Sequence, residues 1–234
     1  MKENVQHNIS RVKNRIKLLS IELGIVLLAF LSSCGIIVFL VKRVFYDRKE
    51  NFDNRVFAYL KQHVNEQNTG LMQVFTFFGS HYFLVPANLL LMAYAAFYKK
   101  DRWFAIKTAS VAVSSLLLMF SLKFFFNRKR PLSPLLGEVP GLSFPSGHAF
   151  MSFTFFGLLI YMVNKKTDHP LLRWLLIFFF LAMIAMVCIS RIYLRVHYAT
   201  DVLAGLSLGM IWLVISLWTV HIIERDKTRL PAVH

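Results

Sequence analysis

The chain has 234 residues, of which 56% are hydrophobic and 23 are Phe, and its formal net charge is +15. So apolar a composition excludes a separate soluble domain and indicates an integral membrane protein. The positive charge then does not point to nucleic acid, because basic loops set membrane topology and meet anionic head groups.

Six apolar runs are long enough to cross a bilayer core of roughly 30 Å. They cover residues 21–41, 74–98, 103–126, 143–163, 171–189 and 202–223. We therefore expect an all-α fold, a polytopic membrane protein in which residues 1–234 form a single bundle of six transmembrane helices. The fourth run is free of polar groups only over 149–163, so its N-terminal end is predicted to lie near the interface.

Two flanking segments have an amphipathic pattern. Residues 1–20 form a basic tail, and the spacing over 8–23 predicts a helix on the inner leaflet, with a solvated tail as the alternative. Within 42–70, apolar residues recur at helical spacing and predict an amphipathic interfacial helix between the first and second spans. These residues are Phe52, Val56, Phe57, Leu60 and Val64. We expect this helix to pack at the membrane interface; the alternative is that it forms a lid over a functional site.

An even number of spans places both termini on one side of the membrane. That side carries 15 of the 27 Lys and Arg residues, which predicts that the termini are cytoplasmic. The motif 31–34 resembles a lipoprotein cleavage box ending at Cys34, but the apolar run continues to Val41. The sequence therefore favours an uncleaved first helix, and with Cys188 the only other cysteine it predicts no disulfide framework.

Polar residues also occur within the second span, at His81 and Asn88. Such side chains usually face the bundle rather than lipid, so a structural hydrogen bond is expected for each. A position of His81 at the border of the active site is the alternative.

The third span ends in two cations, Lys123 and Arg130, that are seven residues apart. If the helix continues to Pro131, both project from one face about 10 Å apart along the axis. Arg128 and Lys129 are expected to reach the head groups. Lys123 lies deeper in the apolar run and needs an anion, which a bound phosphate would supply.

After a loop at 132–142 that is placed to shape access, the segment from Pro145 to His148 opens the fourth span. Pro, Ser and Gly are ordinary helix-start residues, but the N-terminus of a helix also binds phosphate through its free N–H groups. His148 in the first turn of such a helix could donate a proton to a leaving oxygen. A single His in such a place is more often structural.

A third motif, between the fifth and sixth runs, contains Ser190, Arg191, His197 and Asp201. If the chain is helical from Val196, His197 and Asp201 lie on one face, and the carboxylate can hold one ring nitrogen while the other acts as nucleophile or base. Arg191 offers a planar fork suited to phosphate oxygens.

Span counting places all three motifs on the same side of the membrane. Three cations around one pocket would repel a metal ion, which disfavours a binuclear metal hydrolase built on His148, His197 and Asp201. They would instead stabilise the charge of a phosphoryl group during transfer.

These motifs resemble the full three-part signature of the type 2 phosphatidic acid phosphatase family, which also includes vanadium haloperoxidases. The matching segments are Lys123-x6-Arg130-Pro131, Pro145-Ser146-Gly147-His148 and Ser190-Arg191-x5-His197-x3-Asp201. The resemblance implies a hydrolase without metal or other cofactor. In it His197 attacks phosphorus, Asp201 orients the ring and His148 protonates the leaving group. The phosphate would be bound by Lys123, Arg130, Ser146, Gly147 and Arg191.

The resemblance further implies a lipid phosphate substrate within the bilayer and a multi-pass protein of the bacterial inner membrane. With the termini cytoplasmic, span counting places the site on the extracytoplasmic side. Undecaprenyl diphosphate or phosphatidylglycerophosphate is favoured, and dephosphorylation of lipid A is the enzymatic alternative. A carrier or flippase that only binds lipid phosphates is the alternative from another class, and vanadium peroxidase chemistry is a remote third. No nucleic acid and no obligatory protein partner is inferred.

Overall fold

The structure is a computed structural model that describes residues 23–229 except 133, 136 and 138, so the predicted basic tail lies outside the described residues. Six of its helices are long and apolar enough to cross a membrane. They span Leu23–Tyr46, Glu66–Tyr98, Arg102–Phe126, Gly147–Lys166, Pro170–Tyr193 and Ala199–Arg225. The prediction of an all-α bundle with six spans is confirmed.

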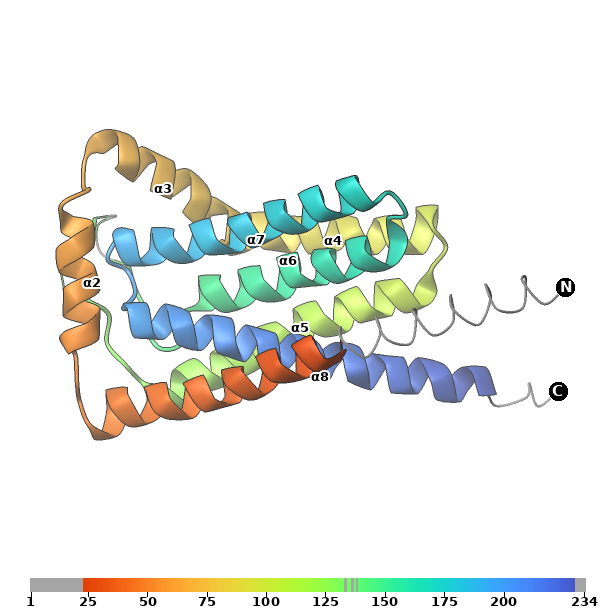
Figure 1. The fold of residues 1–234 in the computed structure, drawn as a ribbon, viewed down its shortest axis with the longest axis horizontal. Coiled ribbons are helices and arrows are strands. Elements are labelled where there is room, and N and C mark those ends of the chain that lie inside the picture. Colours follow the sequence, from red (N-terminus) through yellow and green to blue (C-terminus); the bar gives the residue numbers. More distant parts are fainter. Residues whose placement is uncertain (1–22, 133, 136, 138, 230–234) are drawn as a thin grey trace, which may run out of the picture.

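The elements follow one another along the chain as helices joined by short connections, except for the long segment 127–146 between the third and fourth spans (Figure 1). After the helix that begins at Leu23, they are η1 (Lys42–Tyr46), α2 (Asn51–Lys61), α3 (Glu66–Phe78), α4 (His81–Ala93), η2 (Tyr94–Tyr98), α5 (Arg102–Phe126), α6 (Gly147–Lys166), α7 (Pro170–Tyr193) and α8 (Ala199–Arg229). The second predicted span is thus built from α3, α4 and η2 and begins earlier than its apolar run.

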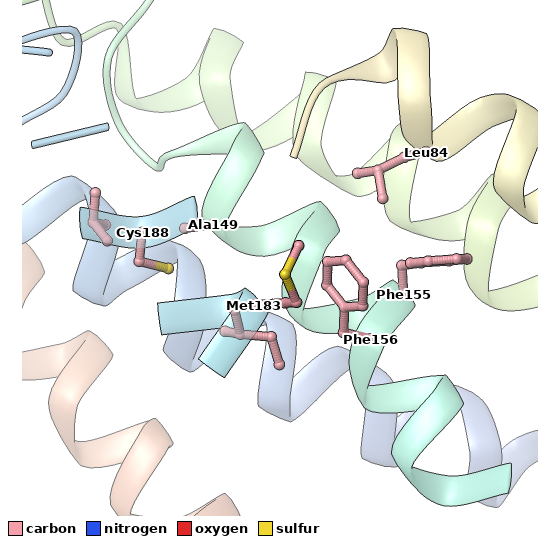
Figure 2. Close-up of a cluster of buried hydrophobic side chains, with 8 residues drawn as sticks. Leu84, Ala149, Phe155, Phe156, Met183 and Cys188 are labelled. Carbon is pink, nitrogen blue, oxygen red and sulfur yellow. The ribbon is translucent and has the colours of Figure 1, made fainter. Parts of the chain in front are cut away.

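Helix α6 is the centre of the bundle and packs along α7 and α8. Figure 2 shows part of this core, in which Phe155 and Phe156 of α6 lie near Met183 of α7 and Leu84 of α4. At its start, α6 also touches the backbone of α8, since a Cβ added to Gly205 would lie 2.6 Å from the carbonyl oxygen of Ser146. Only glycine permits so close an approach, which fixes the start of α6 relative to α8.

The second span is interrupted at Gly79 and Ser80, between α3 and α4. Helix α3 packs on α7, whereas α4 packs on α5. A Cβ added to Gly79 would lie 2.4 Å from Cγ1 of Val187 and 3.2 Å from Cδ2 of His148. The break therefore brings backbone, rather than a side chain, against the start of α6.

Helix α2 is the interfacial element expected between the first two spans, and it runs across one end of the bundle (Figure 1). Its predicted apolar face is only half buried at Val56, Phe57 and Leu60. The one fully buried residue of α2 is the acidic Asp53, with 1% of its surface exposed. A buried carboxylate needs partners, and those partners lie in the segments that carry the motifs.

Candidate active site

The two cations at the end of the third span reach the same region by different routes. Helix α5 ends at Phe126, and Asn127 takes a left-handed conformation with φ 45°. The expectation that Lys123 and Arg130 share one helix face is therefore wrong. Instead, Lys123 Nζ donates to the carbonyl oxygen of Leu142 (2.6 Å), while Arg130 donates to the carbonyl oxygens of Gly141 (3.2 Å) and Val196 (2.9 Å).

The start of α6 lies against the start of α8. The backbone N–H of Ser146 donates to the carbonyl oxygen of Asp201 at 2.9 Å. The hydroxyl oxygen of Ser146 is buried and has no hydrogen-bond partner among the described residues. A Cβ added to Gly147 would lie 3.7 Å from Cε of Lys123, so the first residue of α6 lies beside the lysine side chain.

His148 lies in the first turn of α6, inside the group of motif residues. Its ring is close enough to Arg191, His197, Arg130 and Lys123 for their charges to interact with it. The structure thus brings together the three motifs that the sequence predicted to meet.

Arg191, in the last turn of α7, is 4% exposed. Its Nη1 donates to Oγ1 of Thr76 on α3 at 2.5 Å, and its Nε has no partner among the described residues. The sequence analysis missed Thr76, for which the only signal was a hydroxyl within an apolar stretch. None of the three motif cations has a side-chain carboxylate as a hydrogen-bond partner in the described part of the chain.

His197 lies in the turn before α8, so the prediction that it is helical is wrong. The turn nevertheless brings its Nδ1 to 3.6 Å from Oδ2 of Asp201 and 3.5 Å from Oγ of Ser143. Nδ1 therefore faces the carboxylate, which leaves Nε2 for substrate. Burial lowers the pKa of His197 to about 4, against the opposing effect of Asp201, so the ring is neutral at physiological pH.

Asp201 is fully buried and has three further donors. Oδ2 accepts from the backbone N–H of Tyr198 (2.9 Å) and from the hydroxyl of Ser143, and Oδ1 accepts from Nη1 of Arg128 (2.6 Å). The expectation that Arg128 reaches the head groups is thus wrong, because α5 ends before it and the chain turns inward at Asn127. Lys129, in contrast, is exposed.

A second buried carboxylate, that of Asp53, joins this cluster from α2. Its Oδ1 accepts from the backbone N–H of Thr200 (2.9 Å), and its Oδ2 accepts from Oγ1 of Thr200 (2.8 Å) and from Nη2 of Arg128 (3.3 Å). Asp53 was missed by the sequence analysis, since an acidic residue on the polar side of an amphipathic pattern is normally solvated.

Within the described part of the chain, cavities border the motif residues in two places. The first, of about 320 Å³, lies between α4 and α5 and reaches Gly147 and His148. It is lined by Gly79, His81, Leu84, Val85, Asn88, Leu89, Met92, Ala112, Val113, Leu116, Gly147, His148 and Met151. His81 thus lies at the edge of the site, the less favoured of its two interpretations, whereas Asn88 donates to Leu84 as expected. The second cavity, of about 420 Å³, lies where Arg130 and the following loop meet Arg195.

The described residues contain no group of three or more His, Cys, Asp or Glu side chains that could hold a metal ion. The donors at the site are instead cationic and hydroxyl groups, the set that binds phosphoryl oxygens.

The chain is similar in sequence and in fold to known proteins. The profile of the PAP2 superfamily matches residues 103–225. Phosphatidylglycerophosphatase B of Bacillus subtilis is 34% identical over 150 residues, which cover 63% of this chain and 71% of that protein.

Two solved structures are also similar. The crystal structure of a transmembrane PAP2 type phosphatidylglycerolphosphate phosphatase from Bacillus subtilis aligns with a TM-score of 0.73 and 24% identity, covering 86% of this chain and 98% of the other. Aquifex aeolicus LpxE aligns with a TM-score of 0.56 and 27% identity, covering 70% of this chain and 93% of the other.

Proposed function

Because this chain belongs to the PAP2 superfamily, we propose that it removes a phosphate group from a membrane lipid through a covalent intermediate on His197. As a six-span member of that family, the chain is an integral membrane phosphatase of lipid phosphates. We further propose roles for its residues, the identity of its lipid substrate and its orientation in the membrane. Residues 1–234 would act as one domain.

The observation that carries the proposed chemistry is a set of buried and half-buried donors beside an oriented imidazole. Lys123, Arg130 and Arg191 donate to neutral oxygens, and the Oγ of Ser146 and the Nε of Arg191 are buried without partners among the described residues. Leaving such groups unpaired is costly. The oxygens of a phosphoryl group would satisfy them, with further support from the N-terminus of α6 at Gly147.

The reaction then has two steps. Nε2 of His197 attacks phosphorus while Asp201, beside Nδ1, stabilises the positive charge that develops on the ring. The bond from phosphorus to the lipid oxygen breaks, and His148 gives that oxygen a proton. In the second step His148 takes a proton from water, which attacks phosphorus, breaks the bond to Nε2 and releases inorganic phosphate.

The cavity between α4 and α5 supports a lipid that enters from the side. Several of its lining residues, Val85, Leu89 and Val113 among them, are also exposed on the outer surface of the helices, where a bilayer would contact them. A lipid tail could lie there while its phosphate reaches His148 at the inner end. The name of the Bacillus subtilis relative supports phosphatidylglycerophosphate, with undecaprenyl diphosphate as the other favoured substrate and lipid A as the second choice.

A carrier or flippase would use the same cations without chemistry. The arrangement of His148, His197 and Asp201 favours the enzyme, because binding requires charge but no oriented imidazole. The membrane setting likewise disfavours vanadium peroxidase chemistry, for which halide oxidation with added vanadate is the test.

We also propose that the site faces the extracytoplasmic side of a bacterial inner membrane, with both termini cytoplasmic. Single cysteines would test this in intact cells, in a background in which Cys34 and Cys188 are replaced. A cysteine at Arg55 on α2 should react with an impermeant reagent, and one at Lys165 should not. The opposite labelling would reverse the orientation.

Phosphate release by purified protein across a panel of lipid phosphates and diphosphates tests the function. We expect activity on at least one favoured lipid, inhibition by vanadate and a trapped phosphoenzyme, all abolished in His197→Ala although that variant inserts and folds. Full turnover by His197→Ala would refute the mechanism, and lipid binding without phosphate release would favour the carrier.

A further inference from the structure

We propose that Arg128 and Asp53 are positioning residues for catalysis, which fix the carboxylate of Asp201 and make α2 a part of the catalytic unit. The inference rests on the proposed function, in which Asp201 orients His197. Neither residue belongs to the motifs that the sequence analysis identified.

Arg128 joins two buried carboxylates that come from opposite parts of the chain. Its Nη1 donates to Oδ1 of Asp201 (2.6 Å) and to Oγ1 of Thr200 (2.9 Å), and its Nη2 donates to Oδ2 of Asp53 (3.3 Å). The guanidinium carbon also lies 4.0 Å from the centroid of the Tyr198 ring, a cation–π contact. With 12% of its side chain exposed, Arg128 has little freedom to leave this position.

The two carboxylate oxygens of Asp201 have different hydrogen-bond partners. Arg128 binds Oδ1, while Oδ2 accepts from Ser143 and Tyr198 and faces Nδ1 of His197. Loss of Arg128 would leave Oδ1 with an unpaired buried charge. The carboxylate would then be free to rotate toward other hydrogen-bond donors. The ring of His197 would then lose its fixed orientation toward phosphorus.

The negative charge of the cluster also favours the positive charge that forms on the His197 ring during the reaction. Two carboxylates and one guanidinium give a net charge of −1 while His197 is neutral. When Nε2 is phosphorylated and Nδ1 keeps its proton, the imidazole ring itself carries a positive charge beside this negative cluster, while the negative charge of the phosphoryl group is the one that the bound substrate already carried. The electrostatics therefore favour the intermediate over the enzyme–substrate complex, an effect that appears in the rate rather than in substrate binding.

Asp53 extends this support to α2. Its Oδ1 accepts the backbone N–H of Thr200, in the first turn of α8, so a carboxylate from a distant helix caps the α8 N-terminus. Phe57, one turn further along α2, lies with its ring 5.8 Å from that of Tyr198. Since Asp201 is in the same first turn of α8, the position of α2 determines where the carboxylate lies.

The test compares Arg128→Gln with Lys129→Gln, which removes the neighbouring exposed cation. Arg128 does not reach the phosphate, so we expect Arg128→Gln to lower kcat by about 10- to 100-fold, as for other groups that orient a reactive residue, with KM nearly unchanged. Lys129→Gln should keep both constants, and Arg128→Lys should recover part of kcat. Slower formation of the phosphoenzyme should accompany the loss.

A second comparison keeps the inference testable where Arg128→Gln folds poorly. Asp53→Asn alone should lower kcat, and adding Arg128→Lys to it should cost less than the two separate effects combined, because both act through one cluster. Unchanged kcat in Arg128→Gln and in Asp53→Asn, or a rise in KM without loss of kcat, would overturn the inference. If His197→Ala is inactive at the same time, the proposed function survives; if His197→Ala is active, the function itself fails.

Discussion

Oδ2 of Asp201 lies 3.6 Å from Nδ1 of His197, beyond the usual range of a direct hydrogen bond. Both side chains are almost fully buried, at 0% and 1% exposure. The carboxylate is therefore placed to stabilise a positive charge on the ring when one forms. In the free enzyme, burial keeps the ring neutral.

The pH dependence of stability should reveal this neutral ring. The pKa of His197 is lowered to about 4 by burial, from an ordinary value of 6.5, so between these values the unfolded chain binds more protons than the folded one. Stability should thus fall as the pH is lowered from about 6.5 to about 4. The Tm of His197→Gln should therefore rise relative to the Tm of the wild type as the pH is lowered through this range. A difference that is independent of pH would contradict the neutral buried ring.

The role of His148 as proton donor predicts a dependence on the leaving group. His148→Gln should slow the hydrolysis of an alkyl lipid phosphate by about 10²- to 10⁴-fold, the usual contribution of general acid catalysis. The loss in the first step should be much smaller with p-nitrophenyl phosphate, whose leaving group needs no proton. Rapid-quench measurement of the phosphoenzyme would separate this step from its hydrolysis. Equal losses for both substrates would contradict the assignment.

Filling the cavity between α4 and α5 should act on long lipids alone. Leu116 lines the cavity, whereas the neighbouring Leu117 does not and is 65% exposed. Leu116→Trp should lower kcat/KM for a long-chain lipid phosphate and leave a short-chain analogue little affected, while Leu117→Trp should affect neither. Assays in mixed micelles at fixed surface concentration make the comparison. A loss that is independent of chain length would argue against the cavity as the binding place of the tail.

The break between α3 and α4 should tolerate no added methyl group. Gly79→Ala would place a Cβ against Val187 and His148, and overpacking of this kind costs about 1 to 3 kcal/mol. Gly70 on α3 has open space around it, so Gly70→Ala should be neutral or stabilising by up to about 1 kcal/mol. Thermal unfolding and phosphatase activity of the two variants would show the contrast. Normal activity in Gly79→Ala would mean that this contact does not hold the start of α6.

Much of the fold and site could be predicted because it depends on local sequence. Apolar run length predicts the spans, and counting the spans predicted that His148, His197 and the three cations lie on the same side of the membrane. What failed was the local conformation between spans. A left-handed Asn127 ends α5, and the turn before Ala199 keeps His197 out of α8.

Contacts between segments that are distant in sequence could not be predicted, for a different reason. Arg128 looks like any cation flanking a membrane span, and only the inward turn at Asn127 takes it to Asp201. Asp53 and Thr76 lie far from the motifs in sequence, and their roles depend on where α2 and α3 pack. Neither residue type nor helical periodicity contains that information.

Most residues that line the cavity between α4 and α5 belong to these two helices, whereas His148 lies on α6 and His197 lies in the turn before α8. The residues of α4 and α5 that line the cavity do not include Lys123, so they can be exchanged while the contact between Gly205 and Ser146 keeps α6 and α8 in register. An enzyme of this design can acquire a preference for another chain length or branching pattern by remodelling one wall, and its chemistry is inherited unaltered.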